Sequence, residues 1–240
     1  MNIPILFEDE FLLVVDKPSG IVVNRAESVK EETVQEWMDS KIKNQKSKIK
    51  DKENSEFYKR SGVVHRLDRE TSGVLLLAKT EDVFADLQKQ FKERTILKTY
   101  IALVHGLLIG AGEINVPIAR LPWNREQFGV VPGGRQALTK YKLVKLYARG
   151  REKYTLVGVN PETGRTHQIR VHFKYIGHPI VSDFLYGGRK MYRQDKIFCP
   201  RLFLHASSIS FVHPKTQKRL TVSSPLPSSL ESILSLLEVL

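Results

Sequence analysis

Short apolar runs alternate along the chain with longer amphipathic segments, a pattern typical of mixed α and β structure. The runs at 11–15 and 21–23 are joined by residues 16–20, whose Pro and Gly supply turn geometry, so a strand-turn-strand is expected first. Further strands are expected at 74–78, 100–104, 141–147, 154–159 and 203–211. The stretch 105–135 is rich in Gly and Pro and is expected to form loops or an extended hairpin.

Helical periodicity marks four segments. A short helix is expected at 31–39, and Thr80 is expected to cap a helix with Val83, Phe84, Leu87 and Phe91 on its buried face. Thr166 is expected to cap a third helix that ends at Gly177, and a capping box at 228–231 begins a closing helix through Leu237. Without a repeat or linker, the pattern predicts one α+β domain over 1–240 with a large, mixed, mostly antiparallel sheet.

Residues 65–73 (HRLDRETSG) interrupt this pattern with a densely polar stretch between the apolar runs 63–64 and 74–78. A core strand gains nothing from buried unpaired charges, so the interruption indicates side chains that the sheet exposes for chemistry. If 65–69 is extended, Arg66 and Asp68 share one face, and His65 shares the other with its apolar neighbour. The segment is then either a pocket with an acid and a base or an exposed ion pair that stabilises little.

Charge narrows the class of partner. The chain has 38 Lys and Arg against 26 Asp and Glu, a formal net charge of +12. Such a surplus favours a polyanion, because binding to phosphates releases counterions. Nucleic acid is the first candidate, and an anionic membrane surface is the second. Residues 41–56 carry many lysines and almost no apolar side chain, so a mobile surface loop with solvated lysines is expected there.

Other features limit location and cofactor. Cys199 is the only cysteine, which excludes an intrachain disulfide and favours a reducing compartment. Residues 1–10 lack a basic n-region and no 18 apolar residues run together, so a cytoplasmic protein without a membrane-spanning helix is expected. His167, His172 and His178 follow one another at spacings of five and six, not four, so no metal site is expected.

The polar stretch resembles the signature of the RluA family of pseudouridine synthases. Four further motifs resemble that family in the same order: KPSG (17–20), KTYIALVHG (98–106), TGRTHQIRVH (163–172) and LFLHA (202–206). The resemblance implies the pseudouridine synthase fold, with flanking helices and a central active-site cleft. It also implies an isomerase that detaches a uracil in ribosomal or transfer RNA, turns it and rejoins it through carbon, without a cofactor.

The resemblance also implies roles for single residues. Asp68 aligns with the family's essential aspartate, for which attack on the sugar C1′, attack on uracil C6 and removal of the 2′ proton are alternatives that all suit a carboxylate. Arg170 aligns with the basic residue that pairs with this aspartate and would keep it ionised. Tyr100 matches the tyrosine that packs against the target base and is a candidate for proton transfer. Arg66 aligns with an arginine that fills the space left by the flipped nucleotide.

The remaining candidates lie within the matched motifs. Arg165 is either a phosphate contact or a solvated turn residue. His65, Thr71, Ile169 and Leu204 complete the predicted RNA-binding set. Because Arg170 lies beside the apolar stripe of Ile169, its guanidinium needs an anion, and Asp68 is the expected partner.

Two positions depart from the family pattern, with Asn24-Arg25 in place of His-Pro and Ser182 in place of the Gly before Asp183. They put the local loop geometry in question rather than activity. Many relatives carry an N-terminal S4 RNA-binding domain, and the first motif here begins too early for one. We therefore expect a stand-alone catalytic domain that recognises RNA through its own basic surface, as a monomer that requires no protein partner.

Two other functions compete with this interpretation. An RNA-binding or remodelling protein of the same fold could have lost catalysis, although the presence of Asp68, Tyr100 and Arg170 argues against it. A basic peripheral membrane protein is disfavoured because the closing helix carries only Glu231 and Glu238 as charged groups. Which uridine is modified depends on how RNA shape fits loops such as 41–56 and 105–135, and no residue code exists for such recognition.

Overall fold

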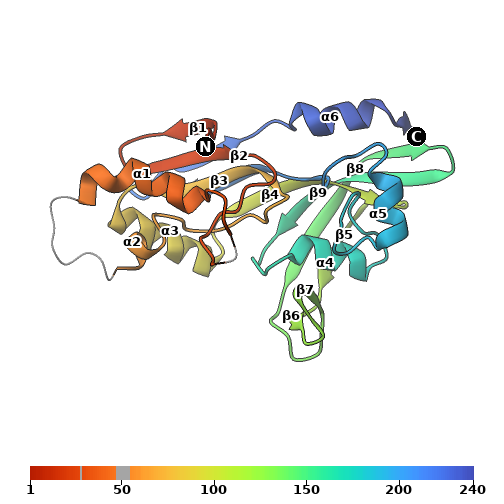
Figure 1. Ribbon diagram of the computed structural model, residues 1–240, viewed down its shortest axis with the longest axis horizontal. Helices are drawn as coiled ribbons and strands as arrows, with labels where there is room; N and C mark the ends of the chain where they lie inside the picture. The colour runs from red at the N-terminus through yellow and green to blue at the C-terminus, as the bar shows by residue number, and fades with distance from the viewer. Residues whose placement is uncertain (28, 47–54) are drawn as a thin grey trace. The chain divides into compact units, whose positions relative to one another are not determined.

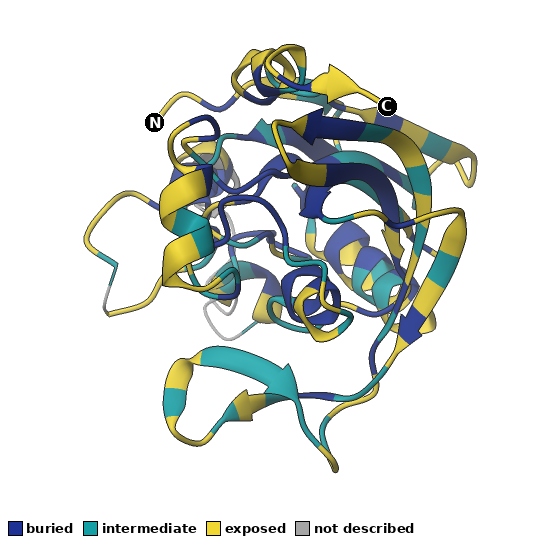
Figure 2. Cartoon of the chain, turned by 90° about the vertical axis from the view of Figure 1, so that its right-hand side faces the viewer, coloured by how far each residue is buried: buried dark blue, intermediate teal, exposed yellow. Residues whose placement is uncertain are grey.

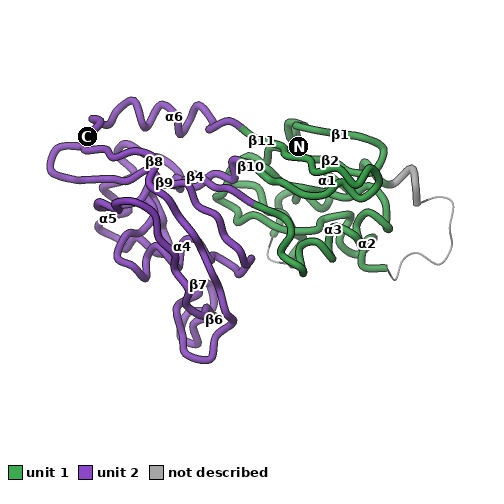
Figure 3. The backbone as a smooth tube through the Cα atoms, turned by 180° about the vertical axis from the view of Figure 1, so that it is seen from behind, with its two compact units in different colours: residues 1–97, 208–224 green, residues 98–207, 225–240 purple. Residues whose placement is uncertain are grey.

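The structure is a computed structural model that describes residues 1–27, 29–46 and 55–240. The chain divides into two compact units: unit 1 comprises residues 1–97 and 208–224, and unit 2 comprises residues 98–207 and 225–240 (Figure 3). Strand β10 (Leu204–Val212) contributes to both, since the boundary falls after Ser207. Whether the two units act as the single domain expected from the sequence stays a prediction.

Unit 1 is built on strands β1, β2, β3 and β10 in that order, with β11 beside β10. Figure 1 labels β1 to β3, and Figure 3 labels β10 and β11. The pairs β1–β2, β2–β3 and β10–β11 are antiparallel. Its other elements are β1 (Ile5–Glu8), β2 (Leu12–Lys17), α1 (Val34–Lys46), α2 (Glu56–Lys59), β3 (Ser72–Ala78), α3 (Glu81–Glu93) and β11 (Arg219–Ser223).

The core of unit 1 lies along β2 and β3. All seven residues of β3 are buried, as the apolar run at 74–78 predicts. Helix α3 begins after Thr80 as expected, but the Thr80 side chain makes no cap hydrogen bond. The helix packs on β3 and buries Val83, Phe84 and Leu87. Each such fully buried side chain contributes roughly 1.5–3 kcal/mol. The predicted stripe is therefore confirmed at these three positions, while Phe91 is only half-buried.

Two expectations for unit 1 are wrong in part, and one strand was not predicted. Residues 21–23 are not a strand, because the carbonyls of Val22 and Val23 accept the backbone N–H groups of Val34 and Gln35 at the start of α1. Strand β2 pairs instead with β1 and β3, and β1 was not predicted. Helix α1 continues to Lys46, so residues 41–46 are helical rather than loop, whereas 47–54 lie outside the described residues.

Unit 2 follows the strand order β10, β4, β9, β8 and β12, with β5 beside β8, and β6 and β7 form a separate hairpin. The pairs β8–β12, β4–β9, β5–β8, β6–β7 and β8–β9 are all antiparallel, which confirms the mostly antiparallel α+β fold. The elements are β4 (Leu97–His105), β5 (Ala111–Asn115), β6 (Ile118–Leu121), β7 (Asn124–Val130), β8 (Leu138–Arg149), β9 (Glu152–Pro161), α4 (Gln168–Tyr175), α5 (Arg189–Asp195), α6 (Ser228–Ser235) and β12 (Glu238–Val239).

The core of unit 2 is a large apolar cluster that joins β4 and β9 to α4 and α6, and its members are among the dark blue residues of Figure 2. Helix α4 contributes Ile169 and Phe173, as its periodicity predicts. Two helix starts differ from expectation. Helix α4 is capped by His167 with a left-handed φ of 55°, not by Thr166, and α6 follows Pro227 without a side-chain cap bond.

In the described part of the chain, no helix combines the length and the apolar character that a membrane crossing requires.

Candidate active site

The polar stretch around Asp68 is a loop of unit 1 that leads into β3. It follows an isolated bridge between Val63 and Leu77, and residues 65–69 do not belong to a strand. The expected alternation is still visible in part, because Arg66 is exposed, Leu67 is buried and Asp68 is half-buried.

One side chain ties this loop to the core of unit 1, and one backbone bond closes the loop on itself. His65 Nε2 accepts the backbone N–H of Leu76 at 3.0 Å, and its ring lies 4.8 Å from that of Phe91 on α3. Thr71 is buried, and its N–H donates to the carbonyl of Asp68 at 3.2 Å. These predicted RNA-binding residues therefore support the loop from within, on either side of Asp68.

The KPSG turn holds the same loop from the other side. Lys17 is fully buried, and its Nζ donates to the carbonyls of Pro18 (2.9 Å), Ile21 (2.8 Å) and Arg69 (3.2 Å). Gly20 N–H also donates to Arg69 O at 2.7 Å. A buried ammonium with several carbonyl acceptors acts as a rigid clamp, so the backbone directly after Asp68 is fixed to this turn.

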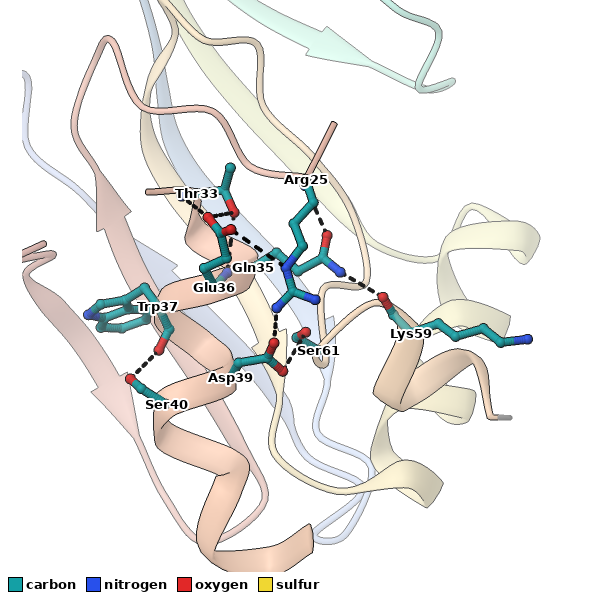
Figure 4. A network of polar contacts seen from close by, with 9 residues as sticks. All are labelled: Arg25, Thr33, Gln35, Glu36, Trp37, Asp39, Ser40, Lys59 and Ser61. Atoms are coloured by element: carbon teal, nitrogen blue, oxygen red, sulfur yellow. Dashed lines mark hydrogen bonds and ion pairs between the residues drawn. The ribbon is translucent and has the colours of Figure 1, made fainter. Parts of the chain in front are cut away.

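Arg25, one of the two residues that replace His-Pro of the family pattern, is part of a polar network in unit 1 (Figure 4). Its guanidinium pairs with Asp39 on α1, and Asp39 Oδ1 accepts the hydroxyl of Ser61 at 2.8 Å. Gln35 accepts the backbone N–H of Arg25 at 3.1 Å and donates to Lys59 O at 2.6 Å. Arg25 is therefore anchored to α1, and Gln35 and Asp39 of this helix in turn bond to α2 and to the turn that precedes the polar loop.

Arg170, in unit 2, lies on α4 and is 2% exposed. The anion that its burial requires is Asp183, whose carboxylate accepts Arg170 Nε at 2.8 Å and Nη2 at 2.9 Å. The ring of Tyr186 covers the guanidinium at 5.1 Å. This two-pronged pair fixes the plane of the guanidinium. The expected pairing of Arg170 with Asp68 stays a prediction.

The departure at Ser182 has a clear geometric consequence. Ser182 adopts a left-handed φ of 59°, a conformation that glycine takes without strain and serine does not. The backbone here therefore follows the path that a Gly before Asp183 would favour. Two hydrogen bonds hold the strained residue, from its N–H to Asp195 Oδ2 at 2.8 Å and from its hydroxyl to Cys199 O.

The turn before α4 is fixed by Gln168, a residue to which the sequence assigned no role. Its Oε1 accepts the hydroxyl of Thr163 at 2.7 Å and the N–H of Arg165 at 3.0 Å. Its Nε2 donates to Leu138 O and to Thr139 Oγ1 at 3.0 Å and 2.9 Å. Arg165 also donates from Nε to Gln136 O at 3.1 Å, so it is not simply solvated.

The other candidates of unit 2 belong to its large apolar cluster. Tyr100 is half-buried on β4 opposite Val159, while Ile169 and Leu204 are buried. On the same face of β4 as Tyr100 lies Lys98, two residues earlier. Burial lowers the pKa of Lys98 to about 8. The matched motif contained Lys98, but nothing in the sequence signalled that this half-buried lysine would have a lowered pKa.

The three histidines considered for metal binding have separate protein partners. His167 Nδ1 meets Tyr186 Oη at 2.8 Å, His172 Nδ1 meets Thr139 Oγ1 at 2.9 Å, and His178 Nδ1 meets His105 O at 2.7 Å. Among the residues that the structure describes, no three His, Cys, Asp or Glu side chains gather as a potential metal site.

The predicted site residues thus form two sets. His65, Arg66, Asp68 and Thr71 share one loop of unit 1, and Tyr100, Arg165, Ile169, Arg170 and Leu204 belong to unit 2. The sequence did not identify three residues that support the site: Lys17, Asp183 and Gln168. The motif of Lys17 signalled only a turn, and Asp183 was noted only as the neighbour of Ser182.

Comparison with known proteins assigns the family. Residues 11–175 match the family model for RNA pseudouridylate synthases. The ribosomal large subunit pseudouridine synthase C of Buchnera aphidicola is 38% identical over 227 residues, which cover 92% of this chain and 67% of the relative. The ribosomal large subunit pseudouridine synthase D of Pseudomonas aeruginosa is 35% identical over 245 residues, covering 99% of this chain and 72% of the relative.

A solved structure agrees with this assignment. Human RNA pseudouridylate synthase domain containing 1 is 26% identical, and the match covers 99% of this chain and 89% of the human chain with a TM-score of 0.73. The chain therefore belongs to the RNA pseudouridylate synthase family and is an RNA pseudouridine synthase, an isomerase.

Proposed function

We propose that this enzyme converts a uridine of large-subunit ribosomal RNA to pseudouridine and that Asp68 performs the chemistry. The choice of RNA is supported by the relatives named as ribosomal large subunit pseudouridine synthases. The observation that carries the role of Asp68 is its loop, because Lys17, His65 and Thr71 fix the backbone around a half-buried carboxylate. Holding a reacting group in a fixed position in this way lowers the activation barrier of the reaction.

The reaction is an isomerisation in which the bond between N1 of uracil and C1′ of the sugar breaks and a bond from C5 to C1′ forms. The proton of C5 leaves and N1 gains one, so no external reactant is needed. Attack of Asp68 on C1′, its attack on C6 and its removal of the 2′ proton remain the alternative first steps, since a carboxylate is competent for each.

The other candidates support this chemistry in distinct ways. Tyr100 offers a flat ring for the uracil, and Arg170 keeps Asp68 ionised. Arg66 is exposed, which suits a cation that replaces the flipped base in the RNA. His65, Thr71, Arg165, Ile169 and Leu204 complete the RNA-binding set. We also propose that the enzyme acts in the cytoplasm as a monomer without a cofactor.

Mapping pseudouridine tests the proposal. RNA from a strain that lacks the gene is incubated with the wild-type enzyme, with Asp68→Asn, or with Asp86→Asn as a matched control on α3, where Asp86 accepts a local bond from Gln90. We expect new pseudouridine in large-subunit RNA with the wild type and the control, and none with Asp68→Asn, which should still fold and bind RNA.

Each other result changes a different part of the proposal. Full activity of Asp68→Asn would remove Asp68 from the reaction. New pseudouridine confined to transfer RNA would correct the substrate. No new pseudouridine with the wild type, in low salt and with RNA bound, would favour the catalytically inactive RNA-binding protein.

A further inference from the structure

The orientation of Arg170 depends on where Asp183 is held. Asp183 is 1% exposed, and besides the two bonds from Arg170 its Oδ1 accepts the N–H groups of Leu185 at 3.0 Å and Tyr186 at 3.1 Å. The carboxylate is therefore locked to its own turn. A displacement of this turn would carry the guanidinium with it, because both prongs of the ion pair end on Asp183.

The start of this turn is the strained residue Ser182. A left-handed φ costs a non-glycine residue free energy, so the surrounding structure must hold it. The two groups that hold Ser182 come from α5 and the segment after it: Asp195 Oδ2 accepts its N–H at 2.8 Å, and Cys199 O accepts its hydroxyl. Cys199 N–H in turn donates to Asp195 O at 2.8 Å.

Asp195 is itself buried and charged, with 1% of its surface exposed. The same oxygen, Oδ2, meets His105 Nε2 at 3.0 Å, and since a carboxylate only accepts, His105 carries its proton on Nε2. The ring of Tyr154 lies 5.2 Å from that of His105. Burial, followed by the charge of Asp195, raises the pKa of Tyr154 to about 12, as expected beside an anion.

From this arrangement we infer that Asp195 is a positioning residue: it holds Ser182 in its left-handed conformation and thereby sets Asp183 and the plane of the Arg170 guanidinium. The inference rests on the proposed function, in which Arg170 acts on the reaction. Asp195 touches neither Arg170 nor the reacting groups in this scheme. It acts through three successive bonded links within unit 2, from Asp195 to Ser182, to Asp183 and to Arg170.

Two substitutions test the links. Asp195→Ala removes the acceptor, and we expect kcat to fall roughly tenfold to a hundredfold, with KM changed less than about twofold, because a displacement of about 1 Å at a catalytic group has effects of this size. Ser182→Gly removes the strain, so it should keep activity on its own. Adding Ser182→Gly to Asp195→Ala should restore most of kcat, since glycine needs no hold to adopt this φ.

Thr155→Val is the matched control. Thr155 is also fully buried in unit 2, and its hydroxyl donates to Gly106 O at 2.7 Å and accepts Leu108 N–H at 3.0 Å. This variant should lower the melting temperature without changing kcat. If Asp195→Ala does not fold, Asp195→Asn serves instead, because its oxygen can still accept Ser182 N–H while the charge is lost. The expected loss is then smaller, and Ser182→Gly should again reduce it.

The outcomes separate this inference from the proposed function. The role of Asp195 would be overturned if the folded Asp195 variant had the kcat of the wild type. It would also be overturned if the Asp195 variant lost as much kcat with Ser182→Gly added as without it. If Asp68→Asn is inactive in the same assay, the proposed function survives that result. If Asp68→Asn is fully active, or Arg170→Met keeps its kcat, the proposed function itself fails.

Discussion

Replacing Lys17 by Met tests whether the buried clamp on the Asp68 loop matters for catalysis as well as for folding. Methionine matches the length of the lysine stem and remains apolar, but it donates no hydrogen bond. The carbonyls of Pro18, Ile21 and Arg69 would lose this donor together. Arg69 O keeps a second donor in Gly20 N–H, so the other two carbonyls suffer most.

The size of the effect follows from these contacts. A buried polar group left without its partner costs about 1 kcal/mol or more, so the free energy of unfolding should fall by roughly 2–3 kcal/mol. For a chain of this length, such a loss lowers the melting temperature by roughly 5–10 °C. The backbone after Asp68 would also lose one of its bonds to the KPSG turn, and a shift of about 1 Å there would lower kcat by up to a hundredfold.

The assay compares urea unfolding and pseudouridine formation at a temperature where the variants are folded. Lys79→Met is the matched control: Lys79 also lies in unit 1, but its ammonium binds Glu8 at 3.1 Å, away from the Asp68 loop. The control should lose little stability and no kcat. Lys17→Arg should resemble Lys17→Met, because a fork of five donors does not fit a fully buried site built for a compact ammonium.

Two results would refute this reasoning. If Lys17→Met unfolds at the urea concentration of the wild type, the three hydrogen bonds do not stabilise the protein. If Lys17→Met is destabilised as expected but the folded enzyme keeps its kcat, the clamp stabilises the fold, and its loss does not displace Asp68.

Three further predictions concern single contacts. Arg170→Met should cost about 3–5 kcal/mol because it leaves Asp183 as a buried unpaired charge, and adding Asp183→Asn should recover much of this stability in urea without restoring activity. Gly62→Ala should cost at least about 2 kcal/mol in the same assay, because Gly62 has a φ of +74° and a Cβ would lie 2.0 Å from Ala78 O. Burial lowers the pKa of His172 from 6.5 to about 4, so the unfolded chain binds the proton more readily and the enzyme should lose at most about 3 kcal/mol between pH 6.5 and 4. This loss should disappear in His172→Gln, and a wild-type stability that is independent of pH in this window would contradict it.

The elements that could be predicted are those whose determinants are local. For α3, the start after Thr80 and the apolar stripe of Val83, Phe84 and Leu87 lie within one segment, and the observed helix and its burial agree with them, although Thr80 makes no side-chain cap bond. Strand β3 was predictable because its apolar run indicates a buried strand whichever strands pair with it. The resemblance of short motifs to the family was enough to single out Asp68, Tyr100 and Arg170 as candidates for the site.

Contacts between distant segments could not be read in this way. The run at 21–23 has strand composition, but its carbonyls bond to the start of α1, and β1 pairs with β2 instead. Periodicity showed that Arg170 needs an anion without showing that Asp183 supplies it. Likewise, the clamp of Lys17 depends on Arg69, 52 residues later, and no local pattern encodes that distance.

The division of the chain has a consequence for synthesis on the ribosome. Unit 1 begins with the first residue but is completed only by residues 208–224. Until that segment leaves the ribosome, β3 lacks its neighbour β10, and a fully buried apolar strand presents an open edge. At about 5–20 residues per second, this exposure lasts several seconds or more. Nascent chains that stop before residue 208 should therefore require chaperones and should aggregate when released.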